Sequence, residues 1–173
     1  MTWLIVLFVA AILLGGLAHA LPPKSERIRN RIKEQALAQG FILYSRKVPC
    51  GTIEGRVHGD QYLRTFYARK GQLDWDLPDF LVYRTTGAQG NYLPEGWDWS
   101  DEQYHRELSD LLSPFLLQLD ARFAAVAFDQ QRGLALHWRE DLQQSNIDSL
   151  IQASEQLLKL SWPIVRQEKQ TPG

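Results

Sequence analysis

The feature that most constrains the fold of this chain is a stretch of 19 residues, Trp3 to Leu21, that contains no Asp, Glu, Lys or Arg. A helix of that length is about 28 Å long, close to the hydrocarbon core of a bilayer at about 30 Å. Five cations follow the stretch directly, and such cations stay on the cytosolic side of a membrane. The sequence therefore predicts a transmembrane anchor over 1–23 in a single-pass bacterial inner-membrane protein, with the amino terminus outside and the rest cytoplasmic.

The same stretch also has features of a cleaved signal peptide. Ala18-His19-Ala20 fits the small-x-small cleavage pattern, and Leu4 to Leu14 has the length of a signal's apolar core. Because no Lys or Arg precedes the apolar run, we favour a retained anchor over cleavage after Ala20. Small residues also recur four apart, a spacing that lets two membrane helices pack as a homodimer: Ala11, Gly15, Gly16 and Ala20.

A second, amphipathic helix is predicted over 24–40. Ile28, Ile32 and Ala36 are four residues apart, and Gly40 follows as a helix terminator. Cations beside an anionic leaflet contribute about 1 kcal/mol of attraction each, so this juxtamembrane helix is expected either to lie on the bilayer or to be a solvated stop-transfer flank. The candidate membrane-surface residues are Lys24, Arg27, Arg29, Arg31 and Lys33.

The remaining sequence alternates between strand and helix patterns. Aromatic and β-branched runs predict strands at Phe41–Val48, Tyr62–Ala68 and Phe80–Arg84, and a hairpin of Phe123–Phe128 with Leu134–Trp138 around the polar tip Asp129–Gly133. Helices are predicted from Ser100 or Asp101, with Pro114 as a position that kinks or shortens the helix, and from near Ser145 to Trp162. The expected fold class is α+β: a soluble domain over 41–165 with a mainly antiparallel sheet and two or three packed helices, then a frayed tail over 166–173.

The formal net charge of −1 conceals an uneven distribution. Lys24 to Lys70 carries eleven Lys or Arg and four Asp or Glu, whereas Gly71 to Glu102 carries one Arg and seven acidic residues. The acidic stretch is also aromatic, a mixture found both in recognition surfaces and in cores bounded by acidic turns. The candidate partner-binding residues are Trp75, Trp97, Trp99, Asp98 and Asp101.

No strong catalytic motif occurs, so no enzyme activity is predicted. Cys50 is the single cysteine, and His58 is the nearest histidine that could activate it, but no orienting third group is evident. His105 and His137 have no metal-ligand spacing, and Asp74 with Asp76 is a pair that an acidic stretch produces by chance. No cofactor, metal or nucleic-acid partner is expected.

The layout of an apolar span, a proline step, a basic helix ending in Gly40 and then strands resembles bacterial single-pass inner-membrane proteins grouped with the YajC-type accessory subunit of the preprotein translocase. The resemblance covers Trp3 to about Val48 and concerns layout alone, since the step here is Leu21-Pro22-Pro23-Lys24. It implies association with a translocase and assigns no functional residue.

Together these patterns predict a membrane-anchored accessory or scaffold protein whose α+β domain binds a protein partner. The alternative is an exported domain, freed after Ala20, that binds or hydrolyses a carbohydrate or other envelope component through Trp and Asp residues of 74–101.

Overall fold

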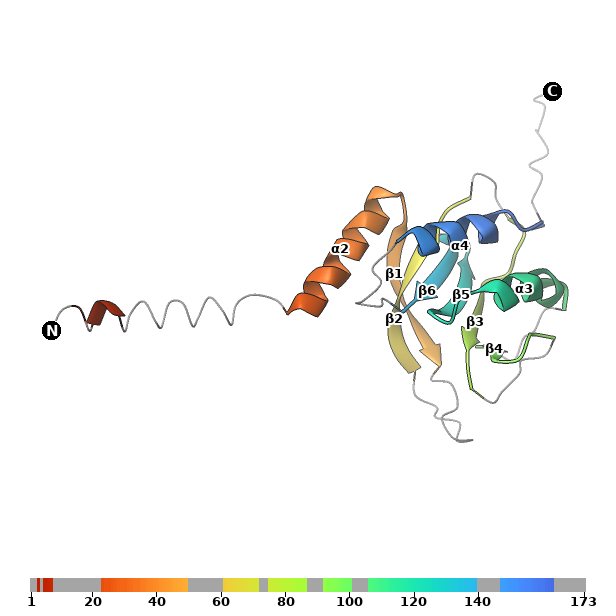
Figure 1. Ribbon diagram of the computed structural model, residues 1–173. Helices are drawn as coiled ribbons and strands as arrows, with labels where there is room; N and C mark the ends of the chain where they lie inside the picture. Colours follow the sequence, from red (N-terminus) through yellow and green to blue (C-terminus); the bar gives the residue numbers. More distant parts are fainter. Residues whose placement is uncertain are drawn as a thin grey trace, which may run out of the picture.

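The computed structural model describes residues 3, 5–7, 23–49, 61–71, 75–86, 92–100, 106–139 and 147–163. In this part of the chain six strands form one antiparallel sheet in the order β1-β2-β6-β5-β3-β4 (Figure 1). The strands are β1 (Ile42–Pro49), β2 (Gln61–Arg69), β3 (Phe80–Arg84), β4 (Trp97–Trp99), β5 (Phe123–Asp129) and β6 (Gly133–Trp138). The helices are α2 (Lys24–Ala38), α3 (Arg106–Gln118) and α4 (Asp148–Leu158).

The helices cover one face of the sheet and bury the main core against it. Alternate residues of the strands point to this face and meet the apolar sides of α2, α3 and α4. Examples are Val126 and Leu136 from the sheet and Leu112 and Leu150 from the helices, which are all fully or almost fully buried. The four-residue spacing that predicted the helix over 24–40 agrees with this packing, since Ile32 and Ala36 of α2 belong to the same core.

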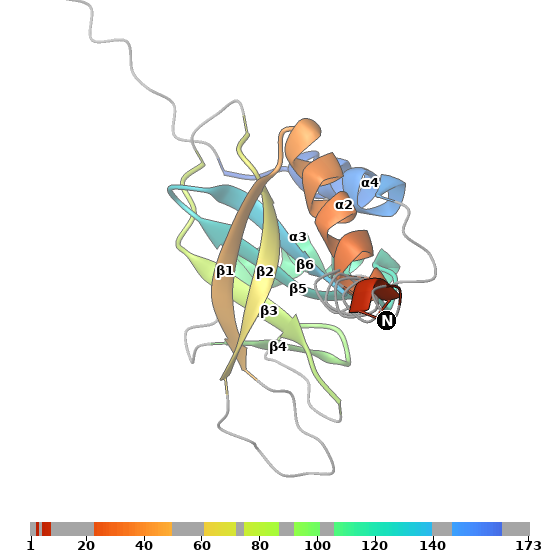
Figure 2. The ribbon, with the colours of Figure 1, turned by 90° about the vertical axis from the view of Figure 1, so that its left-hand side faces the viewer.

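A second, smaller core lies on the opposite face because the sheet coils into a half-barrel. β1 and β2 cross in front of the other strands in Figure 2. The inner side of β1 therefore packs across the sheet, and the Arg46 guanidinium donates to the carbonyls of Phe80 and Phe128 at 3.3 and 3.4 Å. Small residues leave room for this approach: Ala68, Ala125, Ala127 and Ala135.

The hairpin of β5 and β6 is closed by its polar tip. Asp129 Oδ1 accepts the backbone N–H groups of Gln131 and Arg132 at 2.9 and 3.0 Å, and Asp129 pairs with Gly133 in the strand register. Gly133 has φ +88°, a conformation that residues with a Cβ rarely adopt, and this explains why a glycine ends the turn. The predicted hairpin is confirmed.

The predicted strands correspond to β1, β2 and β3 with boundaries within one residue. The short strand β4 was not predicted, because 87–96 has no strand pattern and three residues are too few to produce a periodic signal. β4 is held by pairing with β3, Val82 opposite Trp99 and Arg84 opposite Trp97. Helix α3 continues through Pro114 to Gln118.

The predicted transmembrane helix is wrong. In the part of the chain that the structure describes, no helix is both long enough and apolar enough to cross a membrane. The longest helix there, α2, has 15 residues, is therefore about 22 Å long, and carries seven charged side chains. Of the expected span only Trp3 and residues 5–7 are described, and the small residues proposed for a homodimer lie outside the described residues.

The fold class is corrected accordingly. The body is an antiparallel half-barrel with packed helices, which fits α+β, but the transmembrane part of the predicted fold is not supported. The single-pass inner-membrane localisation depended on that helix and is likewise not supported, whereas the membrane-surface role of the five α2 cations stays a prediction.

Replacement of Gly133 by alanine is expected to destabilise the hairpin. A Cβ at this position would lie 2.7 Å from the Arg69 carbonyl oxygen and 3.0 Å from Lys70 Cα, in addition to the positive φ. We expect Gly133→Ala to lower the free energy of unfolding by about 2 to 4 kcal/mol in urea denaturation. The matched control is Gly40→Ala, also at positive φ but in open space, for which about 1 kcal/mol is expected. Equal losses would contradict the steric argument.

Candidate functional site: a cationic cleft where the sheet opens

The sheet opens between β2 and β6 partway along β2. The two strands pair at three positions, Arg69 with Leu134, Ala68 with Ala135 and Tyr67 with Leu136, and the register ends there. In place of a further pair, His137 Nδ1 donates to the Thr65 carbonyl oxygen over 2.9 Å. A carbonyl oxygen only accepts, so Nδ1 carries the proton in this contact. Beyond this point β2 continues beside β1 alone.

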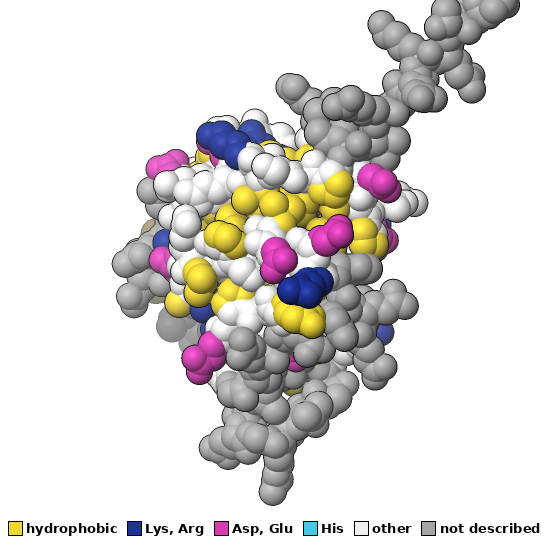
Figure 3. Space-filling view, turned by 90° about the vertical axis from the view of Figure 1, so that its right-hand side faces the viewer, with side chains coloured by type: hydrophobic (Ala, Val, Ile, Leu, Met, Phe, Trp, Pro, Cys, Tyr) yellow, Lys and Arg dark blue, Asp and Glu magenta, His cyan; other side chains and the backbone are white. Residues whose placement is uncertain are grey.

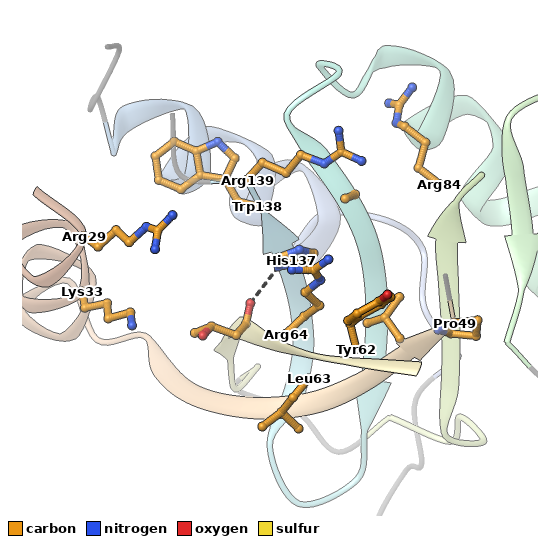
Figure 4. A pocket seen from close by; sticks show the side chains of 13 residues that line it. Arg29, Lys33, Pro49, Tyr62, Leu63, Arg64, Arg84, His137, Trp138 and Arg139 are labelled. Atoms are coloured by element: carbon orange, nitrogen blue, oxygen red, sulfur yellow. Dashed lines mark hydrogen bonds between the residues drawn. The ribbon is translucent and has the colours of Figure 1, made fainter. Parts of the chain in front are cut away.

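The opening forms a cleft of about 560 Å³ that α2 closes from one side (Figure 4). This volume lies within the range of small-ligand sites. The cleft is lined by residues of α2, β1, β2, β3, β5 and the end of β6: Arg29, Lys33, Val48, Pro49, Tyr62, Leu63, Arg64, Thr65, Arg84, Ala124, His137, Trp138 and Arg139.

The charged lining is cationic. Five Lys or Arg side chains and His137 line the cleft, and no Asp or Glu is among the described lining residues. The ion pairs of the described chain lie elsewhere, for example Arg69 with Glu155 at 3.9 Å. Among the described residues Lys33, Arg64 and Arg139 have no carboxylate partner. Figure 4 shows these cations on several elements around the cleft, among them Arg29 and Lys33 from α2 and Arg64 from β2.

Arg84 shows the electrostatic consequence of this crowding. Its pKa is lowered, first by burial and then by the charge of Arg139, and the Asp120 carboxylate offsets this only in part. The charge of Arg139 therefore disfavours the protonated Arg84 guanidinium more than the Asp120 carboxylate favours it. An anion placed between Arg84 and Arg139 would reduce this repulsion.

Arg84 also has a structural role. Its Nε donates to the Phe123 carbonyl at 3.1 Å, and its Nη2 donates to the carbonyls of Leu119 and Asp120 at 3.2 and 3.4 Å. Leu119 and Asp120 directly follow α3, and the Asp120 carbonyl also accepts the Phe123 N–H at 3.0 Å. The guanidinium also lies 4.7 Å from the centre of the buried Trp97 ring. Arg84 thus joins β3, α3 and β5 at the rim of the cleft.

Aromatic and apolar groups complete the lining. Arg64 lies over the Tyr62 ring at 5.3 Å, and Tyr62 and Leu63 remain 47% and 67% exposed at the open edge. Trp138 is 1% exposed, and its Nε1 is buried with no acceptor among the described residues. A buried donor without an acceptor costs free energy, so this part of the lining carries unused hydrogen-bonding capacity.

The structure divides the cations that the sequence placed together on α2. Arg29 and Lys33 are one turn apart and line the cleft, whereas Lys24, Arg27 and Arg31 do not. Spacing of four residues places two side chains on the same helix face. The helix therefore directs part of its charge to a site on its own domain.

The predicted partner-binding surface is not assembled. Trp97 and Trp99 are 2% and 6% exposed and belong to the core, and the Trp75 ring packs edge-on against Phe128 at 5.9 Å. Asp98 accepts the N–H of Trp99, the next residue of β4, at 2.8 Å. The alternative of core aromatics bounded by acidic residues holds for Trp97 and Trp99, and Asp101 lies outside the described residues.

The face on the α3 side differs from the cleft. Figure 3 shows hydrophobic side chains interspersed there with Asp and Glu. Leu117 is 73% exposed on this side of the molecule and Tyr92 is 54% exposed, with the Arg106 guanidinium 5.4 Å from its ring centre. Figure 3 also shows Lys and Arg on this face, so its charge is mixed, whereas the described charged lining of the cleft is basic.

Sequence reasoning missed Arg64, Arg84, Trp138 and Arg139 as site residues. One signal was available: Arg84 is the single base of the acidic stretch 71–102. The others come from elements that become neighbours only through the sheet order, since β2 and β6 are far apart in sequence. Cys50, His58, His105 and Asp74 lie outside the described residues, and no group of three metal-ligating side chains occurs within them.

Replacement of Arg84 by lysine is expected to destabilise the fold. A lysine keeps the charge but loses the planar fork that reaches three carbonyls. We expect Arg84→Lys to lower the free energy of unfolding by about 1 to 2 kcal/mol in urea denaturation. Arg139→Lys, a change of the same type in the same cleft, is expected to stay within about 0.5 kcal/mol of the parent. A reversed order of the two variants would refute the structural role of Arg84.

Removal of the Trp97 ring separates a core role from a recognition role. Because the ring is 2% exposed, Trp97→Ala is expected to lower the free energy of unfolding by about 3 to 5 kcal/mol, measured by thermal and urea denaturation. Unchanged stability would restore Trp97 as a candidate surface residue.

Comparison of the chain with known protein families, curated proteins and solved structures finds no match. The resemblance to the YajC-type subunit therefore stays a prediction, and the cleft is interpreted from its own chemistry.

Proposed function

We propose that this domain is a binding module that holds an anionic ligand in the cleft between β2 and β6. The observation that carries the proposal is the set of Lys and Arg side chains contributed by α2, β2, β3 and the end of β6, with no described carboxylate among the lining residues. The lowered pKa of Arg84, due to burial and then Arg139, supports the same reading. Guanidinium groups bind carboxylates and phosphates through charge-assisted hydrogen bonds.

The proposal retains the expectation that the domain acts by binding a partner and moves the contact from the acidic aromatic stretch to the basic cleft. The carbohydrate alternative loses its basis at Trp97 and Trp99, because buried rings cannot stack on a sugar. The accessory or scaffold role itself stays a proposal.

The test is an NMR titration of the isotope-labelled full chain with inorganic pyrophosphate. We expect shift changes confined to the amides of β2 near Arg64 and to the backbone and indole signals of Trp138. Lys33→Ala and Arg139→Ala are each expected to weaken binding about fivefold, since a half-exposed ion pair contributes about 1 kcal/mol. Binding is also expected to weaken as sodium chloride is raised, through screening.

Arg31→Ala is the matched control. Arg31 lies on the same helix and is exposed, but it does not line the cleft, so pyrophosphate binding should be unchanged. Equal weakening by Arg31→Ala and Lys33→Ala would mean that only net charge matters. Shift changes away from the cleft, or none at all, would refute the proposed site.

A further inference from the structure

We propose, on the basis of the anion-binding function above, that the ligand is an acidic protein segment that binds in extended conformation and adds a strand to the open edge of β2. Such strand addition uses main-chain hydrogen bonds for affinity and side-chain contacts for specificity. The inference rests on two features of the cleft: the backbone groups at its edge and the placement of the cations around that edge.

The backbone of β2 directs hydrogen-bonding groups into the cleft. The Thr65 carbonyl points toward β6, because His137 donates to it. In a strand, alternate residues direct their N–H and C=O groups to the same edge, so Leu63 and Gln61 point the same way as Thr65. The β2·β6 register ends at Tyr67, and no described strand pairs with the edge that Leu63 presents.

The pairing of β2 with β1 supports this assignment independently. Pro49 stands opposite Gln61 in the register and has no N–H to donate. The Gln61 position is therefore one at which β1 and β2 do not exchange a pair of hydrogen bonds, and the same holds two residues on at Leu63. Arg64, in contrast, bonds to β1 opposite Arg46.

The cations surround this edge on both faces of the sheet. On the face that packs against the helices, Arg29 and Lys33 extend from α2. Arg64 shares the inner face of β2 with Phe66 by the alternation of side chains along a strand, and Arg139, which follows β6, also lines the cleft. Acidic side chains on both faces of an added strand would therefore meet a cation.

An extended segment fits the cleft better than a compact anion does. The edge from Gln61 to Thr65 spans about 17 Å at 3.4 Å per residue. A small phosphate would meet the cations but leave the backbone groups of Leu63 and the exposed Tyr62 and Leu63 side chains unused. Exposed edges that bear apolar residues are places where another chain pairs. Charge complementarity with the cations of the cleft indicates that the added segment is acidic.

The probe is the hexapeptide acetyl-Glu-Val-Glu-Glu-Val-Glu-amide, which has acidic residues on both faces when extended. The comparison peptide has the same sequence with every amide N-methylated. It keeps all carboxylates but has no N–H groups and cannot approach a strand edge. We expect the unmodified peptide to bind the full chain at least tenfold more tightly than the methylated one, in isothermal titration at fixed salt.

Hydrogen exchange supplies the structural readout. The Leu63 amide is expected to become protected at least tenfold when the unmodified peptide is bound. The Arg64 amide is already bonded to β1 and is expected to change little, so it is the internal reference. If Leu63→Pro loses peptide binding and Leu63→Ala retains it, the Leu63 backbone N–H contributes to binding. The comparison of the two peptides remains a test even if the proline variant does not fold.

The outcomes distinguish this inference from the proposed function. Equal affinity for the two peptides would overturn strand addition and leave an anion-binding cleft. Absence of binding by either peptide, with pyrophosphate bound in the cleft, would also overturn the acidic-segment inference. If pyrophosphate fails to bind as well, the proposed function fails with it.

Discussion

The separation of β2 from β6 after the Tyr67–Leu136 pair is the constraint on which the site depends. While the strands are paired, their backbone groups satisfy each other and the sheet is closed. Beyond that pair β2 follows β1 across the sheet. The His137 side chain donates to the Thr65 carbonyl, where the β2·β6 backbone pairing has ended. The strand edge left open in this way becomes one wall of the cleft. α2, held over the sheet by Ile32 and Ala36, becomes another.

Arginine side chains add hydrogen bonds to main-chain carbonyls where β1 packs across the coiled sheet and where α3 ends. Arg46 reaches from β1 to the Phe80 and Phe128 carbonyls, and Arg84 joins the end of α3 to β5. A guanidinium is suited to this because it offers several donors in one plane. These arginines bring positive charge with them. Arg84 thus contributes to the fold and to the potential of the cleft, whereas the side chains of Arg139 and Lys33 make no ion pair with a described residue.

The main elements could be predicted because their signals are local. The four-residue spacing of Ile28, Ile32 and Ala36 indicated α2, and the polar tip at Asp129 with its terminal glycine indicated the hairpin. The predicted transmembrane helix failed, as did the partner surface built on Trp97 and Trp99. The sequence shows that a tryptophan has acidic neighbours, but it does not show which of these side chains faces the core. β4 has only three residues and exists through its pairing with β3.

The sequence by itself determined the helices α2, α3 and α4, every strand except β4, the hairpin turn and the excess of positive charge up to Lys70, because each depends on residues close together in the chain. Only the tertiary structure decided that Arg29 and Lys33 of α2 meet Arg64 of β2 and Arg139 beyond β6 around one open strand edge. The physical reason is that the coil of the sheet and the point at which β2 leaves β6 are set by packing between residues far apart in sequence, such as Phe66 with His137 and Arg46 with the Phe128 carbonyl.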